Sequence, residues 1–316
     1  MKVLTVTNMY PTEEEPWFGS FVAYQVQSLR AAGVEMQVLS FDGRARRIEY
    51  ANAARRVREL VHDGFDLVHA HYGLSGAVAM LQRRIPVVTT FWGSDASYVP
   101  WQQRVSWIVA RVTHPVFVAA ANALSLGCRN ATVIPSAIDC DLFRPVGRLE
   151  ARARLDWSPE QRYILFPGAP NNPVKRRELF DATVGELRRD LPELRPIYLE
   201  GFSREEVVLV MNAVDVMLLT SASEGSPLAV KEALACSTPV VSVAVGDVPE
   251  TLSGLPGCAV APPDPVALAA GVTKALAAGR PAELRERACE FSGPRIAARV
   301  IDLYERVAAE GRREAA

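Results

Sequence analysis

The sequence predicts an α/β protein built from two Rossmann-like, doubly wound domains, and three observations lead to this prediction. The chain has 316 residues, a length that commonly divides into two globular domains with one hydrophobic core each. Short apolar runs alternate with helical patterns along most of the chain, which is typical of parallel sheets covered by helices. An aperiodic stretch after Ile134-Pro135 interrupts this alternation, which then starts again.

The first half carries four predicted strands separated by short loops and helices. A turn-rich loop after the first strand leads into an amphipathic helix over Phe21–Ala32, which Gly33 ends, and an arginine-rich helix covers Ala51–Val61. The predicted strands are Lys2–Asn8, Val34–Phe41, Phe65–Ala70 and Val87–Phe91. Because ligands of doubly wound sheets bind beyond the carboxyl ends of the strands, the loops after these strands are where we expect chemistry.

The second half repeats the alternation. We place the connection in the stretch containing Asp139, Pro145 and Gly147, so that residues 1–145 form the first domain and residues 146–293 the second. The predicted strands and helices of the second domain are Tyr163–Phe166, Arg177–Arg189, Ile197–Leu199, Val216–Leu219, Leu228–Cys236 and Pro239–Val243. A last helix, at about 294–316, has an apolar face that includes Ile296, Val300 and Leu303, and we expect it to pack back on the first domain.

Composition excludes several classes of protein. A formal net charge of −1 argues against binding nucleic acid through a basic surface. The five cysteines are widely spaced and form no C-x-x-C pair, which favours reduced thiols over a disulfide framework or a zinc site. Apolar runs stop well short of the ~20 residues that cross a bilayer, and Met1–Val6 enters a strand pattern without a secretory signal. We therefore expect a cytoplasmic protein.

The segment from Ser223 to Cys236, which follows the strand Val216–Leu219, has the layout of an anion site. Ser226 suits an N-cap and Pro227 the first helical position, so a helix begins there with free backbone N–H groups, which attract phosphate. Glu224 lies beside this helix start, where its carboxylate suits sugar hydroxyls. Glu232 lies two turns further and suits a ribose diol. The alternative is a capping Glu224 and a solvated Glu232.

These residues resemble the retaining GT-B glycosyltransferases, and within them glycosyltransferase family 4. The resemblance rests on two glutamates separated by seven residues, Glu224 and Glu232, and on the continuation 233–242. Further similar segments are Asp66–His71, Gly93-Ser94-Asp95, Val133-Ile134-Pro135 with Ile138-Asp139, and Val245–Glu250. The resemblance implies two domains facing across a cleft, with the nucleotide sugar held mainly by the second domain. It also implies an acceptor held mainly by the first domain, and no required metal or cofactor.

A basic pair after the first strand of the second domain neutralises the donor diphosphate in this family. The similar segment here runs from Phe166-Pro167-Gly168 to Lys175-Arg176, so the resemblance makes Lys175 and Arg176 the phosphate ligands. Ala169 stands where an arginine is usual, and Asn171 or Asn172 are the neutral substitutes. The alternative is that the cations at 175–177 form a solvated helix start, an arrangement that is locally unfavourable at a helix N-terminus without an anion.

In the first domain the resemblance points to four residues. Gly19 matches the glycine of the loop that meets the diphosphate across the cleft, where a missing side chain permits close approach. Trp92 stands where many members carry a histidine that contacts the transferred sugar, and an indole offers a stacking face and one N–H donor. Asp95 and His71 are the neighbouring polar groups expected at the sugar, with His71 facing the cleft from a strand end.

The sequence therefore predicts a retaining glycosyltransferase that moves a sugar from a UDP- or GDP-linked donor to a saccharide or lipid-linked hydroxyl. The residues expected at the donor are Lys175, Arg176, Glu224, Gly225, Ser226, Pro227 and Glu232, with Gly19, Trp92, His71 and Asp95 from the first domain. A sugar-nucleotide 2-epimerase and a noncatalytic sugar-nucleotide-binding subunit are the alternatives. Six arginines between Arg44 and Arg58 suit anionic lipid on the inner membrane face, or simply a solvated helix face.

Overall fold

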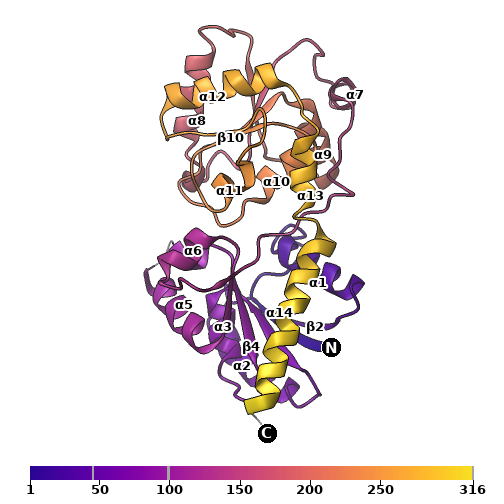
Figure 1. The fold of residues 1–316 in the computed structure, drawn as a ribbon, viewed down its shortest axis with the longest axis vertical. Helices are drawn as coiled ribbons and strands as arrows, with labels where there is room; N and C mark the ends of the chain where they lie inside the picture. Colours follow the sequence, from indigo (N-terminus) through magenta and orange to yellow (C-terminus); the bar gives the residue numbers. More distant parts are fainter. Residues whose placement is uncertain (45, 98–99, 315–316) are drawn as a thin grey trace. The chain divides into compact units, whose positions relative to one another are not determined.

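The computed structural model describes residues 1–44, 46–97 and 100–314. The chain divides into two compact units. Unit 1 comprises Met1–Ala137 together with the C-terminal segment from Gly293, and unit 2 comprises Ile138–Ser292 (Figure 1). The chain thus passes between the units twice, after Ala137 and after Ser292.

Unit 1 is built on a parallel sheet with the strand order β2-β1-β3-β4-β5-β6. β3 is buried along its whole length, as expected for a parallel strand covered on both faces. The register pairs Val3 with Met36 on one side and with Leu67 on the other. The strands are β1 Lys2–Thr7, β2 Glu35–Ser40, β3 Leu67–His71, β4 Val87–Phe91, β5 His114–Phe117 and β6 Thr132–Val133.

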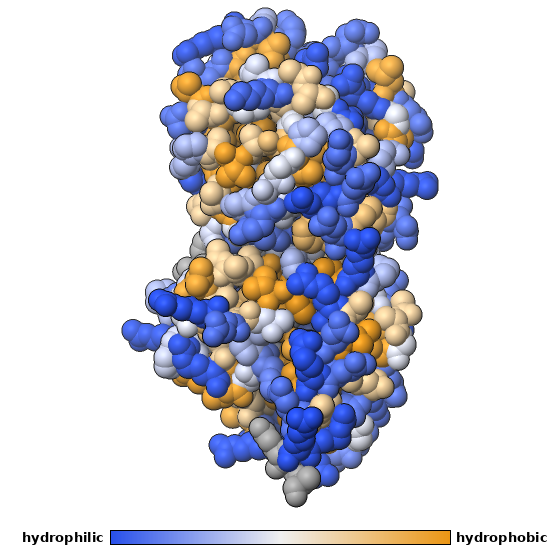
Figure 2. Space-filling model, in the orientation of Figure 1, coloured by the Kyte–Doolittle hydropathy of each residue, from blue (hydrophilic) through white to orange (hydrophobic). Residues whose placement is uncertain are grey.

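Helices cover the sheet of unit 1. They are α1 Ser20–Ala31, α2 Ile48–Leu60, α3 Gly73–Ala79, α4 Ser94–Ser97, α5 Pro100–Val112, α6 Ala120–Ser125 and α14 Gly293–Glu314. The apolar side of α14 packs on the core that contains Val3 and Leu67, while its outer side is hydrophilic (Figure 2). Tyr304 of α14 also lies with its hydroxyl 2.5 Å from Nδ1 of His69 in β3. The last helix therefore completes unit 1 through both apolar and polar contacts.

Unit 2 has a second parallel sheet with the strand order β11-β10-β9-β7-β8. Its strands are β7 Tyr163–Phe166, β8 Arg195–Tyr198, β9 Val216–Leu219, β10 Val240–Ser242 and β11 Ala259–Val260. Its helices are α7 Arg148–Arg154, the 3₁₀ helix η1 Pro173–Lys175, α8 Arg177–Leu187, α9 Arg204–Ala213, α10 Leu228–Ala235, α11 Val248–Leu252, α12 Pro265–Ala278 and α13 Glu283–Cys289. α8 and α12 lie side by side on one face of this sheet (Figure 1).

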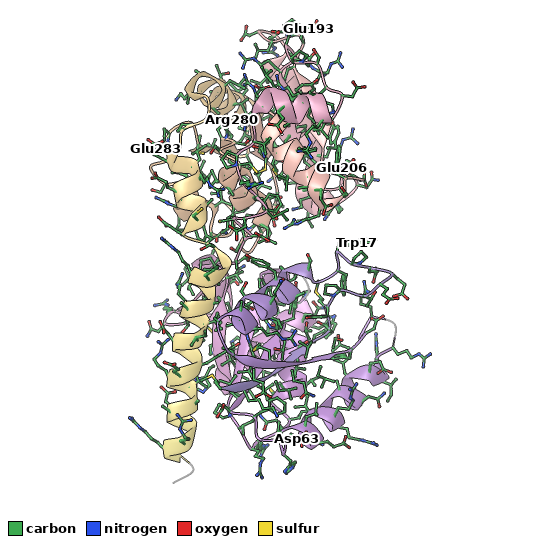
Figure 3. The ribbon with its side chains drawn as sticks, turned by 90° about the vertical axis from the view of Figure 1, so that its right-hand side faces the viewer. Trp17, Asp63, Glu193, Glu206, Arg280 and Glu283 are labelled. Carbon is green, nitrogen blue, oxygen red and sulfur yellow. The ribbon has the colours of Figure 1, made fainter. Side chains whose placement is uncertain are left out.

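Arg280 ties together the helices on the other face of unit 2. Its guanidinium donates to the carbonyl oxygens of Asn212 and Val214 at the end of α9 and of Cys236 after α10; Arg280 is labelled in Figure 3. Burial lowers the pKa of Arg280 to about 10, so the group stays charged at neutral pH. The ends of α9 and α10 are thereby fixed relative to one another, and α10 is the helix that follows the predicted donor loop.

The boundary between the units falls earlier than the sequence pattern suggests. We placed it at residue 145, whereas the chain enters unit 2 at Ile138. The reason is that Ile138 and Phe143 are buried in the core of unit 2, so the aperiodic stretch is part of that unit rather than a linker. In the described part of the chain, no helix combines the length and apolar character needed to cross a membrane.

Candidate active site

The carboxyl edge of the sheet in unit 2 brings three loops together. β10, β9 and β7 are neighbours, so the loops that follow them emerge side by side. The loop after β7 carries Lys175 and Arg176, the loop after β9 carries Glu224, and the loop after β10 carries Asp247. The hydroxyl of Thr220 donates to the backbone oxygen of Lys175 at 2.8 Å, and the N–H of Ala222 donates to Val174 at 2.8 Å. The first two loops are therefore fastened to each other by hydrogen bonds.

Lys175 and Glu224 form an ion pair in this loop cluster. Lys175 Nζ lies 2.7 Å from Glu224 Oε1, and their side chains are 23% and 16% exposed. A β-carbon on Gly168 would come within 3.2 Å of the Lys175 side chain, so the glycine leaves room for the lysine to lie across the loop. The two residues predicted to bind diphosphate and sugar are therefore neighbours, and the Glu224 carboxylate is not a helix cap.

Arg176 is the second basic residue of the cluster. Its backbone is left-handed with φ 52°, and within the described chain its guanidinium forms no ion pair. Arg177, in contrast, pairs with Asp181 at 3.0 Å and lies over the ring of Tyr198. Asn172 is also engaged, because its side-chain oxygen accepts the N–H of Val174. The positive charge available to an anion at this edge thus comes from Arg176 and from Lys175.

Glu232 is buried, which contradicts the alternative that it is a solvated helix residue. It is only 4% exposed, and its Oε1 lies 2.9 Å from Arg204 NH1. Burial raises the pKa of Glu232, and the charge of Arg204 opposes that shift. Arg204 starts α9, is half-exposed and covers the ring of Phe143. Arg204 was not among the predicted site residues, and no pattern in the sequence pairs it with Glu232.

The predicted start of α10 is wrong by one residue. α10 begins at Leu228, and Pro227 is the N-cap, with an extended backbone and no side-chain capping hydrogen bond. Ser226 does not cap the helix, because its hydroxyl donates to Asp247 Oδ2 at 2.7 Å and accepts from Lys231 Nζ at 2.6 Å. Gly225 contributes its carbonyl, which accepts the N–H of Asp247 at 3.1 Å. Residues 225–227 are buried, so they define the shape of the loop.

Asp95 in unit 1 is a fully buried carboxylate bonded to backbone groups. It accepts N–H groups of Gly73 and Trp92 at 3.1 Å and of Gly93 at 3.0 Å. Burial raises its pKa to about 6, and the backbone donors oppose that shift. These contacts join the turn after β4 to the start of α3. This arrangement favours a positioning role for Asp95 over the predicted direct contact with the sugar.

Trp92 and His71 contact each other at the carboxyl edge of the unit 1 sheet. The indole N–H of Trp92 donates to His71 Nδ1 at 3.3 Å, and the indole packs on Phe21 at 4.5 Å between ring centroids. His71 is fully buried, so it does not present an open face as we expected, because Trp92 covers it. Burial lowers the pKa of His71 well below its usual value, and its Nε2 has no partner within the described residues. Trp92 itself remains partly exposed.

Gly19 precedes α1 and has a left-handed backbone with φ 71°. A β-carbon there would overlap with the backbone of Met9 and Tyr10, so the close approach that requires glycine is to the protein's own chain. The same loop projects Trp17 outward at 70% exposure (Figure 3). The predicted contact of Gly19 with diphosphate stays a prediction.

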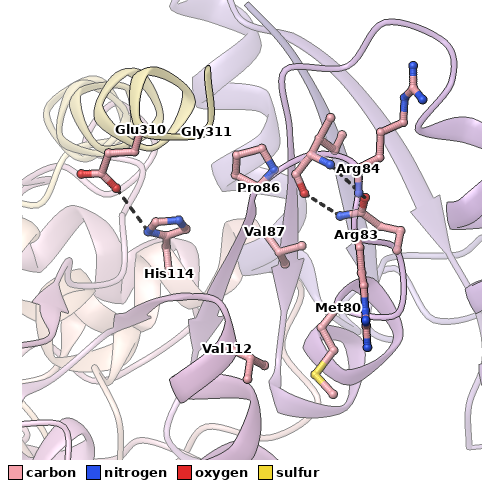
Figure 4. A pocket seen from close by; sticks show the side chains of 11 residues that line it. Met80, Arg83, Arg84, Pro86, Val87, Val112, His114, Glu310 and Gly311 are labelled. Atoms are coloured by element: carbon pink, nitrogen blue, oxygen red, sulfur yellow. Dashed lines mark hydrogen bonds and ion pairs between the residues drawn. The ribbon is translucent and has the colours of Figure 1, made fainter. Parts of the chain in front are cut away.

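A separate pocket lies at the opposite end of the unit 1 sheet. Its lining includes Pro86 and Val87 at the start of β4, His114 at the start of β5, and Glu310 of α14, which lies 3.9 Å from His114 (Figure 4). Ligands of this type of sheet bind at the carboxyl ends of the strands, whereas this pocket lies at the amino ends. It is therefore not the donor site.

Two Rossmann-like units, with two basic residues and two glutamates gathered at the carboxyl edge of the second sheet, are the framework of GT-B enzymes, which transfer sugars. Part of the chain matches the family described as glycosyl transferases group 1. The model of that name matches residues 171–278, and a glycosyl transferase 4-like domain matches residues 23–127. Together these matches cover both units, including the loops of Lys175, Glu224 and Trp92.

Curated relatives are glycosyltransferases. A D-inositol 3-phosphate glycosyltransferase of Mycobacterium marinum is 28% identical over 232 residues, which are 58% of this chain and 50% of the relative. The putative teichuronic acid biosynthesis glycosyltransferase TuaC of Bacillus subtilis is 24% identical over an alignment of 351 residues, which covers 87% of this chain and 89% of the relative. This chain thus spans only about half to three fifths of the length of the D-inositol 3-phosphate glycosyltransferases that it matches.

Solved structures share the fold. Sucrose-phosphate synthase from Thermosynechococcus elongatus superposes with a TM-score of 0.76 at 19% identity, covering 98% of this chain and 99% of that one. Anabaena Alr3699/HepE, solved in complex with UDP and glucose, gives a TM-score of 0.72 at 16% identity, covering 96% and 99%. The prediction of a GT-B fold is confirmed.

Proposed function

We propose that the protein is a retaining glycosyltransferase that takes its sugar from a nucleotide-diphosphate donor and passes it to a hydroxyl of a saccharide or a lipid-linked saccharide. The observation that carries the proposal is the meeting of Lys175, Arg176 and Glu224 at the carboxyl edge of the unit 2 sheet. UDP-sugars are the first donors to test, because Anabaena HepE binds UDP. GDP-sugars are the second class of donor that the resemblance allows.

Departure of the diphosphate is the step that these cations serve. Breaking the anomeric C–O bond places negative charge on the leaving diphosphate and positive charge on the sugar ring. Lys175 and Arg176 offset the first charge, and the Glu224 carboxylate stabilises the second while holding a sugar hydroxyl. The proposed reaction uses no metal ion or other cofactor, so EDTA is expected to leave the rate unchanged.

The Lys175–Glu224 ion pair positions these two charged groups before the donor binds. Separating the pair would leave each charge partly buried without a partner, which costs free energy, so the two side chains stay together. An incoming diphosphate then shares Lys175 with Glu224 instead of recruiting a mobile lysine. This preorganisation lowers the cost of binding that flexible side chains otherwise add.

Glu232 is proposed to hold the ribose of the donor. One carboxylate oxygen pairs with Arg204, and the other is available to accept from a vicinal diol. The charge of Arg204 favours the ionised form of the buried carboxylate, and an ionised carboxylate is the stronger acceptor. In unit 1, the partly exposed Trp92 offers its indole face to the sugar, with His71 behind it and with Asp95 fixing the turn.

Contact with an anionic membrane face is proposed through α5 rather than through the arginines between Arg44 and Arg58. Arg44 pairs with Glu15 and Asp42, and Arg55 pairs with Glu59, so part of that cluster is already neutralised. Among the exposed residues of α5 are two tryptophans, two aliphatic residues and two arginines: Trp101, Arg104, Trp107, Ile108, Arg111 and Val112. No acidic residue occurs between 96 and 138 in the sequence. Tryptophan and arginine together suit a lipid headgroup layer.

Release of nucleoside diphosphate tests the proposal. A thermal-shift screen with UDP, GDP and their sugars first identifies the donor, since a ligand at a hundred times its Kd stabilises by about 2.7 kcal/mol. Incubation with that donor and saccharide acceptors should then release the free nucleoside diphosphate, and NMR should show an anomeric configuration equal to that of the donor. Interconversion of the donor sugar without release would indicate an epimerase, and binding without turnover a noncatalytic subunit.

A further inference from the structure

A second buried ion pair underlies the Glu224 loop. Lys231 of α10 is fully buried, and its Nζ lies 2.7 Å from Asp247 Oδ2 and 2.6 Å from Ser226 Oγ. The centroid of the Phe291 ring lies 4.7 Å from the same ammonium group. The hydroxyl of Ser226 closes a triangle by donating to Asp247 Oδ2 at 2.7 Å. The buried ammonium therefore contacts a carboxylate, a hydroxyl and an aromatic ring.

This arrangement is costly for the fold alone. Burial lowers the pKa of Lys231, and Asp247 opposes that shift. An apolar side chain of similar length would fill the same space without the desolvation penalty, and buried ion pairs are often neutral or unfavourable relative to such replacements. What the charged pair adds is a defined geometry, because each of its hydrogen bonds has a direction. The question is then which part of the molecule that geometry holds.

It holds the loop that carries Glu224. The carbonyl of Gly225 accepts the N–H of Asp247 at 3.1 Å, next to the Ser226–Asp247 hydrogen bond. Gly246 has a left-handed backbone with φ 55°, and a β-carbon there would overlap with the carbonyl of Gly225. The loops after β9 and β10 are thus joined by two hydrogen bonds, beside a close backbone approach of Gly246 to Gly225. Lys231 is the cation that neutralises Asp247 at their centre.

The fastened loop ends at the proposed donor contact. Glu224 directly precedes Gly225, and its carboxylate is bonded to Lys175. A displacement at Ser226 or Gly225 therefore moves the Glu224 carboxylate and the backbone at the start of α10 together. Glu224 itself touches neither Lys231 nor Asp247 in the hydrogen bonds and ion pairs of the described chain. Any influence of this pair on the sugar must act through the loop.

We propose that Lys231 and Asp247 are positioning residues that fix the Glu224-Gly225-Ser226 loop in the geometry needed for sugar transfer. The inference rests on the proposed function and adds two residues to it. A misplacement of about 1 Å in a reacting group costs up to a hundredfold in rate. We therefore expect Lys231→Met to lower kcat by roughly ten- to a hundredfold, with the Kd for nucleoside diphosphate changed by less than about threefold.

The experiment compares Lys231→Met with Lys274→Met, which removes an exposed lysine from α12. The control should keep the parent kcat. On the Glu224→Gln background, Lys231→Met should lower kcat by less than about twofold, because residues that act through one group are not additive. The proposal would be overturned if Lys231→Met left kcat unchanged. It would also be overturned if Lys231→Met lowered kcat on the Glu224→Gln background by the same factor as in the parent. A loss confined to the Kd for nucleoside diphosphate would overturn it as well.

Two further measurements keep the test decisive. If Lys231→Met does not fold, Asp247→Asn replaces it, since asparagine keeps the shape and one acceptor oxygen, and the same outcomes apply. Hydrogen exchange of residues 223–228 should rise in either variant and stay at the parent level in Lys274→Met, a readout that needs no turnover. If the parent transfers no sugar, the proposed function fails, while unaltered exchange in both variants would overturn the positioning role separately.

Discussion

Lys175 Nζ lies 2.7 Å from Glu224 Oε1, so the two side chains expected at opposite ends of the scissile bond are bonded to each other. One belongs to the loop after β7 and the other to the loop after β9, and they meet because those strands are neighbours. Such a pair links the leaving-group contact to the sugar contact. Substitution of either residue is therefore expected to disturb the other.

Lys175→Ala should weaken binding of nucleoside diphosphate far more than binding of the free nucleoside, because the substitution removes a hydrogen bond to phosphate. A charge-assisted hydrogen bond contributes about 1.5 to 3 kcal/mol, which corresponds to roughly ten- to a hundredfold in Kd. Calorimetric titration of the two ligands measures the difference. Arg177→Ala is the matched control, since that arginine already pairs with Asp181. Equal weakening for both ligands would remove Lys175 from the diphosphate site.

Glu224→Gln should lower turnover more than nucleotide affinity. The amide keeps the shape and one acceptor oxygen but lacks the charge that strengthens the contact as positive charge develops on the ring. A fall of roughly ten- to a hundredfold in kcat is expected if the contact tightens in the transition state. Transfer rate and nucleoside-diphosphate affinity are measured on the same preparation. Normal turnover would leave Glu224 as no more than the partner of Lys175.

Glu232→Ala should reduce the preference for ribonucleotide over 2′-deoxyribonucleotide. The carboxylate is the proposed acceptor for the ribose diol, and its removal leaves Arg204 half-exposed, where water solvates it. Because Glu232 is buried, its truncation also leaves a cavity, so a thermal melt checks that the variant stays folded. Arg204→Ala serves as the comparison and should weaken the discrimination less, because it keeps the carboxylate but removes the charge that favours its ionised form. A Glu232→Ala protein that discriminates as the parent does would contradict the ribose contact.

Acid should destabilise unit 1 through His69. Burial lowers the pKa of His69 to about 3, so the folded protein keeps the ring neutral while the unfolded chain takes up a proton below about pH 6.5. The contribution of neutral His69 to the free energy of unfolding is present above about pH 6.5. It is lost as pH falls towards the folded pKa, by up to about 1.4 kcal/mol per pH unit. His69→Gln should flatten this dependence in denaturant titrations between pH 7 and pH 4, and exposed His62→Gln should not. If the free energy of unfolding depends on pH with the same slope in the parent and in His69→Gln, the prediction is wrong.

The second-domain motif was predictable because its chemistry is local in sequence. Glu224 and Glu232 lie on one loop and helix, and the strand before them has a clear apolar run, so the prediction needed no long-range contact. Arg204 and Lys231 escaped prediction for opposite reasons. Arg204 reaches Glu232 from another helix, whereas Lys231 lies within the motif but is buried against Asp247 of another loop, which only the tertiary structure reveals.

The first unit was harder to predict from sequence. β5 and β6 were missed, because His114–Phe117 and Thr132–Val133 are too short to give a periodic signal. His71 was placed facing outward because a strand end is usually open, and the burial by Trp92 depends on a side chain from another loop. The prediction that Ser226 caps α10 was wrong for a similar reason. Its hydroxyl bonds to Asp247 of another loop, and no local sequence pattern reveals that contact.

The hydrogen bond between His69 and Tyr304 joins residues 235 positions apart along the chain. During synthesis, the ribosome finishes all of unit 2 before α14 emerges. Unit 1, whose synthesis begins first, therefore completes its core last. Until then the apolar surface around Val3 and Leu67 lacks its cover, and exposed strands of this kind favour aggregation. Truncation within α14 should consequently lower the yield of folded protein while unit 2 acquires its structure normally.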